Sequence, residues 1–262
     1  MPDTIEELRH KVAVSNKILA MMGMVKITWG HVSARIPGTE EMFIRCRGPE
    51  DTGMAFVSDE DIRRGPFNTQ PGTDLGDGWR APGELAIHGE ILRMRPEVNC
   101  VIHAHPPGAL MIGLGDVPLR PILGSYDGGI SLKMLKQEGY AVFPHSHLIN
   151  RPELAHRMMA AMGSRHAVIL RGHGVTISGT SVEEATVRAV IFEALCRITW
   201  QLRQAGVTAP EVTNETVEEY VPNWARTAFV ARQDEGFWRH WEELLDTAPA
   251  LPFLVGLDNV MI

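Results

Sequence analysis

The chain contains 262 residues, of which 44% are hydrophobic and 22% are charged, and this composition is typical of a globular protein rather than a disordered one. Its formal net charge is −7 and its lysines and arginines form no dense cluster, which argues against a protein that binds nucleic acid through a basic surface. The acidic N-terminal segment is unlike a signal peptide, and no apolar run approaches the ~20 residues of a membrane span, so we expect a cytoplasmic protein without a membrane partner.

The N-terminal segment predicts one helix and two strands. Residues 4–24 carry apolar side chains near the helical period, and Thr4 and Glu7 stand at the spacing of a capping box. Two short β-like runs follow at 31–36 and 41–46, and a Pro-Gly turn signal separates them. We therefore expect a helix that leads into a pair of strands.

The following segment predicts a long loop, a helix and a strand. Residues 48–80 are rich in Gly, Pro, Asp and Thr, so we expect a long functional or interfacial loop there. Pro82 can begin a helix that ends before Pro96. Residues 99–105 then have the pattern of a buried strand that ends in two histidines.

The second half of the chain predicts alternating strands and helices. The expected elements are a strand over 140–145, a helix over 151–162, two strands joined by a turn over 166–179, and a long helix over 181–204. The C-terminal segment predicts further helices. We expect an α/β catalytic domain over 1–210 and a helical extension over 211–262 that packs on the same domain or on a neighbouring subunit.

The three cysteines are scattered along the chain and odd in number. Cys46, Cys100 and Cys196 therefore predict neither a disulfide framework nor a cysteine-ligated zinc site. We expect each of them to be a small buried side chain.

His103 and His105 are a candidate pair of metal ligands. Two histidines at i and i+2 on a strand point to the same face, so both can reach one ion. The prolines at 106 and 107 end the strand sharply, which places the pair at the edge of the sheet. A packed pair of histidines is the alternative.

Two further residues extend this candidate site. His173 lies between two glycines in a turn, where the backbone can approach another group closely. Glu84 lies near the start of the helix before the histidine pair, and His88 follows one turn later on the same helix face. Glu84 can also be a simple capping residue, and His88 a fourth ligand, a supporting partner or a packed helix residue. His145 and His147 are the main rival ligand pair.

The ordered pattern of Glu84 with His88, then His103 with His105, then a Gly-His-Gly turn at His173 resembles the class II aldolase/adducin family. The similarity covers residues 5 to about 205. It implies a three-layer α/β/α domain with a central, largely antiparallel sheet. It also implies a homo-oligomer, usually a tetramer, with active sites at subunit interfaces.

The resemblance also implies the roles of individual residues. His103, His105 and His173 would hold one divalent metal ion per subunit, which can be zinc, manganese, iron or cobalt. Glu84 would be a displaceable fourth ligand or the general acid/base. Tyr126 falls about where the aldolases of the family keep a tyrosine acid.

The chain departs from the sugar-phosphate aldolases of this family at their phosphate-binding positions. The sequence GHVS stands at 30–33 and RAPG at 80–83, so the small polar donors that hold phosphate are missing. The sequence offers histidine and arginine instead. The residues that we expect to bind or orient a carboxylate substrate are His31, Ser33, Arg45, Arg47 and Arg80.

With these departures the sequence resembles the decarboxylase branch of the family, which acts on hydroxylated aromatic or pyridine dicarboxylates and related oxo-acids. The resemblance implies a decarboxylase of a small-molecule carboxylate, in which the metal stabilises a phenolate or enolate. His31 would orient the carboxylate or assist proton transfer. The alternatives are an aldolase that acts on a non-phosphorylated substrate, a dehydratase or epimerase, and a metal-free binding module like the adducin head.

Overall fold

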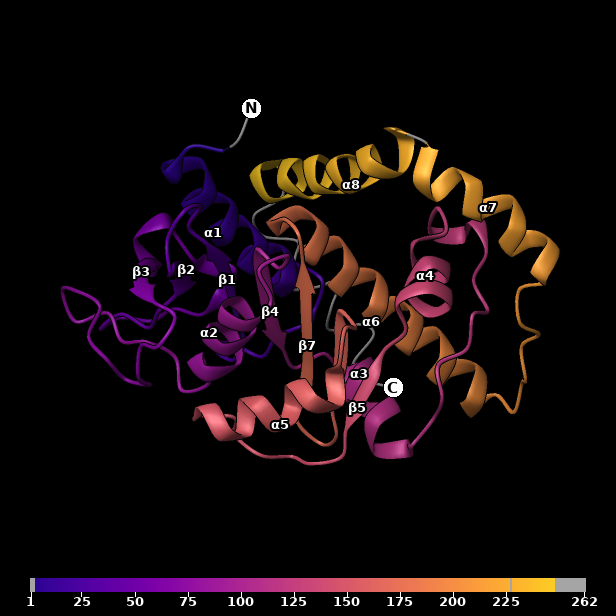
Figure 1. The fold of residues 1–262 in the computed structure, drawn as a ribbon, viewed down its shortest axis with the longest axis horizontal. Helices are drawn as coiled ribbons and strands as arrows, with labels where there is room; N and C mark the ends of the chain where they lie inside the picture. Colours follow the sequence, from indigo (N-terminus) through magenta and orange to yellow (C-terminus); the bar gives the residue numbers. More distant parts are fainter. Residues whose placement is uncertain (1–2, 227, 248–262) are drawn as a thin grey trace.

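A seven-stranded mixed sheet forms the middle layer of the molecule (Figure 1). The computed structural model describes residues 3–226 and 228–247. The strands are β1 (His31–Arg35), β2 (Glu41–Arg45), β3 (Ile62–Pro66), β4 (Cys100–Ala104), β5 (Ala141–Phe143), β6 (Ala167–Leu170) and β7 (Gly174–Gly179). Their order is β3-β2-β1-β4-β7-β6-β5, and only the pair β5 and β6 is parallel. The predicted, largely antiparallel sheet is confirmed.

Helices cover both faces of this sheet. The longer helices are α1 (Ile5–Met21), α2 (Leu85–Met94), α3 (Pro107–Gly115), α5 (Pro152–Met162), α6 (Val182–Gln204), α7 (Asn214–Arg226) and α8 (Ala228–Thr247). Apolar residues of α1, α3, α6 and α8 form one hydrophobic core, and those of α2 and α5 form another. A short helix, α4 (Ile130–Lys133), precedes β5. The α/β/α layering is therefore confirmed.

Strand alternation separates the two cores and decides which face carries the candidate site. In β4, Cys100 and Ile102 contribute to the core beneath α1 and α6, whereas Val101 contributes to the core beneath α2 and α5. His103 alternates with Ile102, so it lies on the same face as Val101. The candidate site therefore lies on the face of the sheet that α2 and α5 cover.

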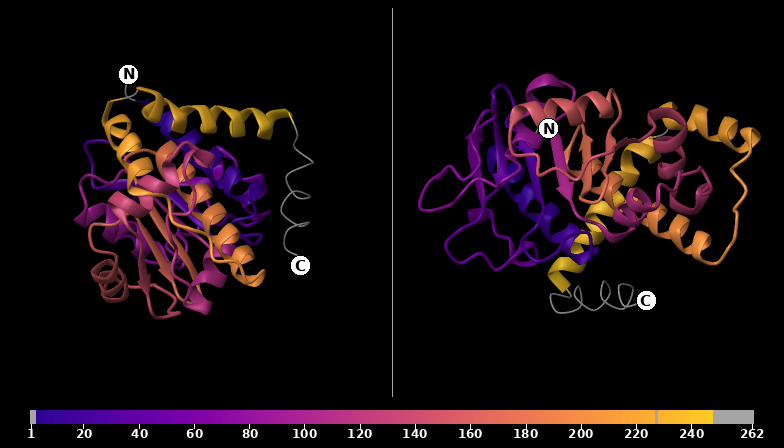
Figure 2. Two further views of the ribbon diagram at one scale, coloured as in Figure 1. Left: turned by 90° about the vertical axis from the view of Figure 1, so that its right-hand side faces the viewer. Right: turned by 90° about the horizontal axis from the view of Figure 1, so that it is seen from below.

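Helix α8, at the C-terminal end of the described chain, packs against the first core. Helix α8 contacts α1 and α6, and the left view of Figure 2 shows it lying over both. Trp238 and Trp241 are buried in this contact. The helices expected here are confirmed, and residues 248–262 of the predicted extension lie outside the described residues. Among the described residues, no helix combines the length and the apolar character that a membrane span requires.

Two of the predicted elements differ from the structure. The segment 48–80 contains strand β3, which forms the edge of the sheet beside β2. The sequence IRRGP hides this strand because it lacks clear alternation of polar and apolar residues. The second helix begins at Leu85 rather than Pro82, since Glu84 has non-helical backbone angles and serves as its N-cap residue. All three cysteines are free and buried, as expected from the sequence.

Candidate metal centre

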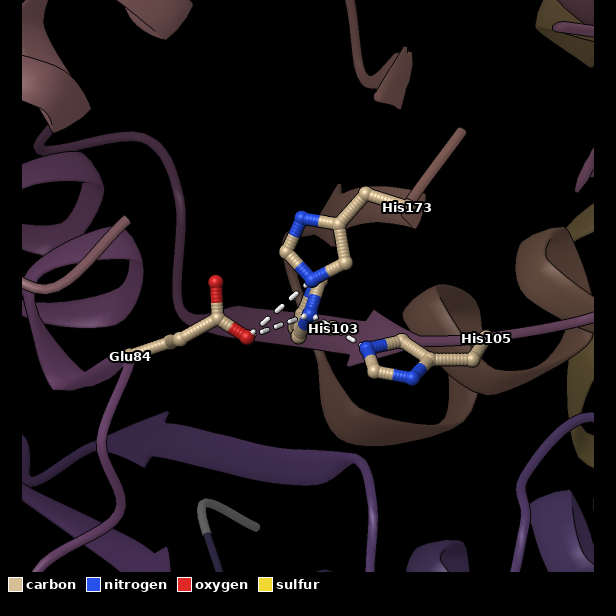
Figure 3. A group of neighbouring side chains, drawn as sticks. All are labelled: Glu84, His103, His105 and His173. Carbon is tan, nitrogen blue, oxygen red and sulfur yellow. Dashed lines mark hydrogen bonds and ion pairs between the residues drawn. The ribbon is translucent and has the colours of Figure 1, made fainter. Parts of the chain in front are cut away.

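Three segments distant in the sequence meet at the end of β4. His103 is fully buried in β4, and His105 follows directly after the strand. His173 lies in the turn between β6 and β7, and Glu84 lies at the N-terminus of α2. Figure 3 shows these four side chains directed toward one another. The structure thus brings together the three predicted ligands and the predicted acid/base.

The distances between these side chains describe one compact cluster. The Nε2 atoms of His103 and His105 are 3.0 Å apart. Glu84 Oε2 lies 3.1 Å from His103 Nε2 and 3.3 Å from His173 Nε2. One potential ligand atom from each of the four residues lies within 4.8 Å of the others. Four donors therefore face a single point.

Gly174 makes the close approach of the His173 turn possible. A Cβ atom at this position would lie 2.3 Å from the carbonyl oxygen of Ala104 and 2.8 Å from the ring of His105. Real Cβ atoms do not approach so closely, so any other residue would push the turn away from β4. The glycine after His173 is therefore required by packing, which supports the reasoning from the sequence.

The hydrogen bonds of the site fix the lone pairs of the imidazoles. His103 Nδ1 lies 3.1 Å from the carbonyl oxygen of Val175, which can only accept, so Nδ1 carries the hydrogen. Its Nε2 lone pair consequently points into the cluster. Burial, and then the neighbouring His103 and His173, lower the pKa of His105 to about 3, so that ring is neutral at physiological pH.

Glu84 is held as a carboxylate at the same point. Burial alone would raise its pKa, but the neighbouring His103 and His173 outweigh burial and hold the pKa of Glu84 well below its usual range. Its second oxygen, Oε1, accepts a hydrogen bond of 2.9 Å from the N–H of Ile149. The carboxylate therefore has a fixed orientation, with one oxygen facing the cluster.

This donor set fits a divalent cation. Imidazole and carboxylate ligands of a tetrahedral site have bonds of about 2.0–2.2 Å and therefore lie about 3.3 Å from one another. The closest pairs in the cluster are 3.0–3.3 Å apart. Two imidazole Nε2 atoms 3.0 Å apart repel when both carry lone pairs, and a shared cation removes that repulsion. The four residues could hold one ion, and this ligand set admits zinc, manganese, iron and cobalt.

The rival histidine pair lies outside this cluster. The rings of His145 and His147 stack on each other with centroids 5.1 Å apart, and His145 Nε2 lies 3.3 Å from the guanidinium of Arg157. Within the described residues the two join no group of potential ligands. The segment that carries them is nevertheless tied to the site, because Ile149 follows two residues later and bonds to Glu84.

His31 and Ser33 lie on β1, directly beside β4. His31 pairs with His103 in the strand register, and the two rings have centroids 5.4 Å apart. Ser33 is fully buried and bonds to His88 rather than facing open space. His31 thus stands next to the metal cluster, whereas Ser33 lies beneath it. Their predicted substrate roles remain predictions.

The predicted arginines hold a turn of the chain. Arg45 is only 2% exposed, pairs with Asp51 and donates a hydrogen bond of 2.9 Å to the carbonyl oxygen of Thr28. Arg47 donates to the same carbonyl oxygen at 3.3 Å. Arg80 is exposed and donates to the carbonyl oxygen of Gly72. Each guanidinium already has a backbone partner, and no contact with the cluster is among these bonds.

The turn held by Arg45 and Arg47 carries a residue that the sequence reasoning missed. Trp29 is 54% exposed, and its ring centroid lies 6.3 Å from that of His105. Ile27, two residues earlier, has a φ of 51°, which is strained for a β-branched side chain. The arginines therefore stabilise a strained turn that presents an indole at the rim of the cluster. In the sequence, the position of Trp29 directly before Gly30 and His31 was the only indication that it lies near the site.

Tyr126 lies apart from these groups. It belongs to a short 3₁₀ turn, Ser125–Asp127, and its side chain is 76% exposed. Among the described residues it has no hydrogen bond to the cluster. Its predicted role as an acid is not tested by this geometry, because the predicted sites lie at subunit interfaces.

The profile of the class II aldolase and adducin N-terminal domain matches residues 10–200. The chain belongs to the class II aldolase/adducin family. Class II aldolase-like geometry is also evident in the fold: an aldolase II superfamily protein from Pseudomonas syringae superposes with a TM-score of 0.75 at 20% identity, covering 96% of this chain and 97% of that one.

Two curated relatives share more of the sequence. A 3,4-dihydroxyphthalate decarboxylase of Arthrobacter keyseri is 36% identical over 220 residues, which cover 83% of this chain and 88% of the relative. A protein of the same name from Terrabacter sp. is 40% identical over 200 residues, covering 76% and 82%. The predicted resemblance to the decarboxylase branch of this class II aldolase family is confirmed.

Proposed function

We propose that this protein is a divalent-metal-dependent decarboxylase that acts on a hydroxylated aromatic carboxylate or a related oxo-acid. The relatives support a carboxy-lyase, because two proteins named 3,4-dihydroxyphthalate decarboxylase are 36% and 40% identical to it over most of both chains. The observation that carries the proposal is the cluster of three imidazoles and one carboxylate, whose potential ligand atoms lie within 4.8 Å of one another. The cluster occurs in a chain that is related to decarboxylases.

The proposed reaction breaks the bond between the substrate carbon and its carboxylate. Carbon dioxide leaves, and the electron pair of the bond stays on the substrate carbon. A divalent cation held by His103, His105 and His173 would stabilise the negative charge that spreads to the neighbouring substrate oxygen. The same carbon must then receive a proton, which the protein has to supply.

Glu84 is proposed to deliver that proton: since the site holds it as a carboxylate, it would first take up a proton from solvent and then pass it to the carbon. Its Oε1 is fixed by the Ile149 N–H, so Oε2 can face only the cluster. A carboxyl group that is held in one orientation at the reacting carbon does not need to reorient before it transfers its proton. Glu84 is a displaceable fourth ligand when no substrate is bound. Tyr126 is the second proposed acid, and its exposure is consistent with action at a site shared with a neighbouring subunit.

We also propose which metal the enzyme uses, how it assembles, where it is located and how its chain is divided into domains. Each subunit would hold one ion of zinc, manganese, iron or cobalt, and the active form would be a cytoplasmic homotetramer with interfacial sites. Members of the family are often oligomeric, which supports this part of the proposal. Residues 1–210 would form the catalytic domain, with 211–262 as its helical extension.

The deciding experiment measures the products of metal-loaded protein. Purified protein is incubated with a panel of hydroxy-aromatic carboxylates and aldol substrates, and CO₂ release is scored against aldehyde release. We expect CO₂ from at least one ortho-hydroxy carboxylate. Release of aldehyde alone would identify an aldolase instead. A metal content below a few tenths of an ion per chain, with neither product, would identify a binding module of the adducin type.

A further inference from the structure

A buried chain of hydrogen bonds connects the backbone of β4 to the imidazole beside the metal cluster. His31 Nδ1 lies 2.7 Å from His88 Nε2. His88 Nδ1 lies 2.7 Å from Ser33 Oγ, and Ser33 Oγ in turn lies 3.5 Å from the carbonyl oxygen of Val101. The chain joins β1, α2 and β4 in one line, and its last ring is the one that stands next to His103.

Burial gives this chain an inner and an outer end. His88 and Ser33 are fully buried, whereas His31 keeps 5% of its surface exposed. The inner end is a backbone carbonyl in the middle of the sheet. The outer end is the Nε2 atom of His31, which forms no hydrogen bond with the part of the chain that the structure describes. Any group that meets this chain from outside must therefore meet His31 Nε2.

The carbonyl at the inner end sets the direction of every hydrogen in the chain. A carbonyl oxygen can only accept, and the Val101 carbonyl is a partner of His88 as well as of Ser33. We therefore assign a hydrogen to His88 Nδ1, which Ser33 Oγ accepts, and direct the Ser33 hydroxyl to Val101. Burial lowers the pKa of His88 to about 3, so the ring is neutral and carries a single N–H. With that hydrogen on Nδ1, His88 Nε2 must accept from His31 Nδ1–H. His31 is then left with a lone pair on Nε2.

A lone pair at this place discriminates between substrate groups. A neutral imidazole nitrogen without a hydrogen accepts a hydrogen bond from a hydroxyl and repels the oxygens of a carboxylate. Of the two roles predicted for His31, orientation of the substrate carboxylate is therefore disfavoured. The position 5.4 Å from the His103 ring instead suits the hydroxyl that stands next to the carboxylate in an ortho-hydroxy acid.

We infer that Ser33 and His88 are positioning residues that hold His31 as a hydrogen-bond acceptor for the substrate hydroxyl, which makes this a site for ortho-hydroxy carboxylates. The inference rests on the proposed function and adds the substrate feature that the site selects. A site that hydrogen-bonds a hydroxyl rejects the analogue that lacks it, because a buried polar atom then loses its partner. The selectivity of His31 therefore depends on His88 and Ser33, neither of which touches the substrate.

The test compares the binding of two small acids to metal-loaded protein by calorimetry. The probes are 2-hydroxybenzoate and 2-methoxybenzoate, which differ in whether the ortho oxygen can donate. The wild type is expected to prefer the hydroxy acid by about tenfold, a typical net value for one hydrogen bond. His88→Leu breaks the chain and should reduce this preference to less than about twofold, while the metal content stays at that of the wild type.

Two matched variants separate positioning from general disruption. His88→Gln keeps a donor and an acceptor at the same place, so it should restore most of the preference. Ser33→Ala leaves the Val101 carbonyl in reach of His88, so its effect should be intermediate. An unchanged preference in His88→Leu with intact metal would overturn the inference, as would a wild type that prefers the methoxy acid.

A second measurement does not depend on binding or on the stability of the His88 and Ser33 variants. Protein labelled with ¹⁵N in its imidazole rings is studied by NMR, and the His31 signals are assigned with His31→Asn. The chain direction requires the hydrogen of His31 on Nδ1, and a hydrogen on Nε2 would overturn it. Because this readout involves no turnover, the absence of CO₂ release from the wild type would reject the proposed function and leave the positioning result intact.

Discussion

The Nε2 atoms of His103 and His105 face each other at 3.0 Å, with Glu84 Oε2 only 3.1 Å from the first. The Nδ1 hydrogen of His103 is given to the Val175 carbonyl, so its inward nitrogen carries a lone pair. Lone pairs and a carboxylate held this close repel each other unless a cation lies between them. Binding of a divalent cation between these groups would therefore stabilise the fold.

Removal of the metal should lower the thermal stability of the protein. A ligand that binds only the folded state at about 1,000 times its Kd stabilises it by about 4 kcal/mol. For a chain of this size that corresponds to a fall in Tm of about 10 °C on chelation. Calorimetry with and without chelator measures this change in Tm.

His103→Ala should lose the metal, the activity and the response to chelator together. The control is His145→Ala, a histidine outside the cluster, and retention of metal by His103→Ala would contradict the site.

Glu84→Gln should keep the fold and lose most turnover. The amide oxygen can still accept from Ile149, so the side chain stays in place. It can no longer donate an acidic proton, and general acid catalysis contributes about 10²–10⁴-fold. Glu97→Gln is the matched control, since that side chain is 55% exposed and lies in a surface ion pair. Steady-state rates of CO₂ release at saturating substrate test the prediction, and a Glu84→Gln rate near that of the wild type would remove Glu84 as the acid.

Arg45→Met should destabilise the protein rather than weaken substrate binding alone. Loss of one partner from a buried ion pair costs about 3–5 kcal/mol, because the other charge is left uncompensated. The residue left behind here is Asp51, and the Thr28 carbonyl loses a donor as well. Arg47→Met, in which a 46% exposed side chain is lost, should cost less than about 1 kcal/mol. Urea unfolding measures both. A raised KM with unchanged stability in Arg45→Met would instead support the substrate role that the sequence suggested.

The free energy of unfolding of the metal-free protein should fall as the pH is lowered from about 6.5. Burial, and then the neighbouring His103, lower the pKa of His88 to about 3 in the folded state, compared with about 6.5 in an unfolded chain. Between these values the unfolded chain binds one more proton on this residue, so stability rises with pH by up to about 1.4 kcal/mol per unit. The stability that depends on a neutral His88 is fully present above about pH 6.5 and is lost as the pH falls toward about 3.

His88→Gln removes this contribution, and the pKa of His31 stays lowered in the variant because burial is the main cause of its shift. Urea unfolding at several values between pH 4.5 and 6.5 should give a slope that is shallower by about one proton in the variant. Equal slopes would mean that His88 is protonated in the folded state, and would contradict the neutral ring on which the direction of the His31–His88–Ser33 chain depends.

Local patterns in the sequence were sufficient to predict most of the elements and to name the residues that meet in the cluster. The capping box of Thr4 and Glu7 is present in α1, and the i, i+2 spacing of His103 and His105 puts both at one end of β4. The glycine after His173 is required by its contact with Ala104. The capping box and the histidine spacing follow from the period of a helix or a strand, which a short stretch of sequence determines by itself, whereas the contact between Gly174 and Ala104 is tertiary.

Tertiary structure alone decided which polar groups meet. Nothing local to Arg45 indicates that it would be buried against Asp51 and the Thr28 carbonyl, because the partners come from separate turns. Nothing local to Ser33 indicates its bond to His88, since that contact depends on the packing of α2 across β1. Edge strand β3 was missed for a similar reason: its pairing with β2, rather than its own alternation, makes it a strand. The four residues of the cluster could be named from the sequence, whereas the hydrogen-bond partners around them follow from strand register and helix packing.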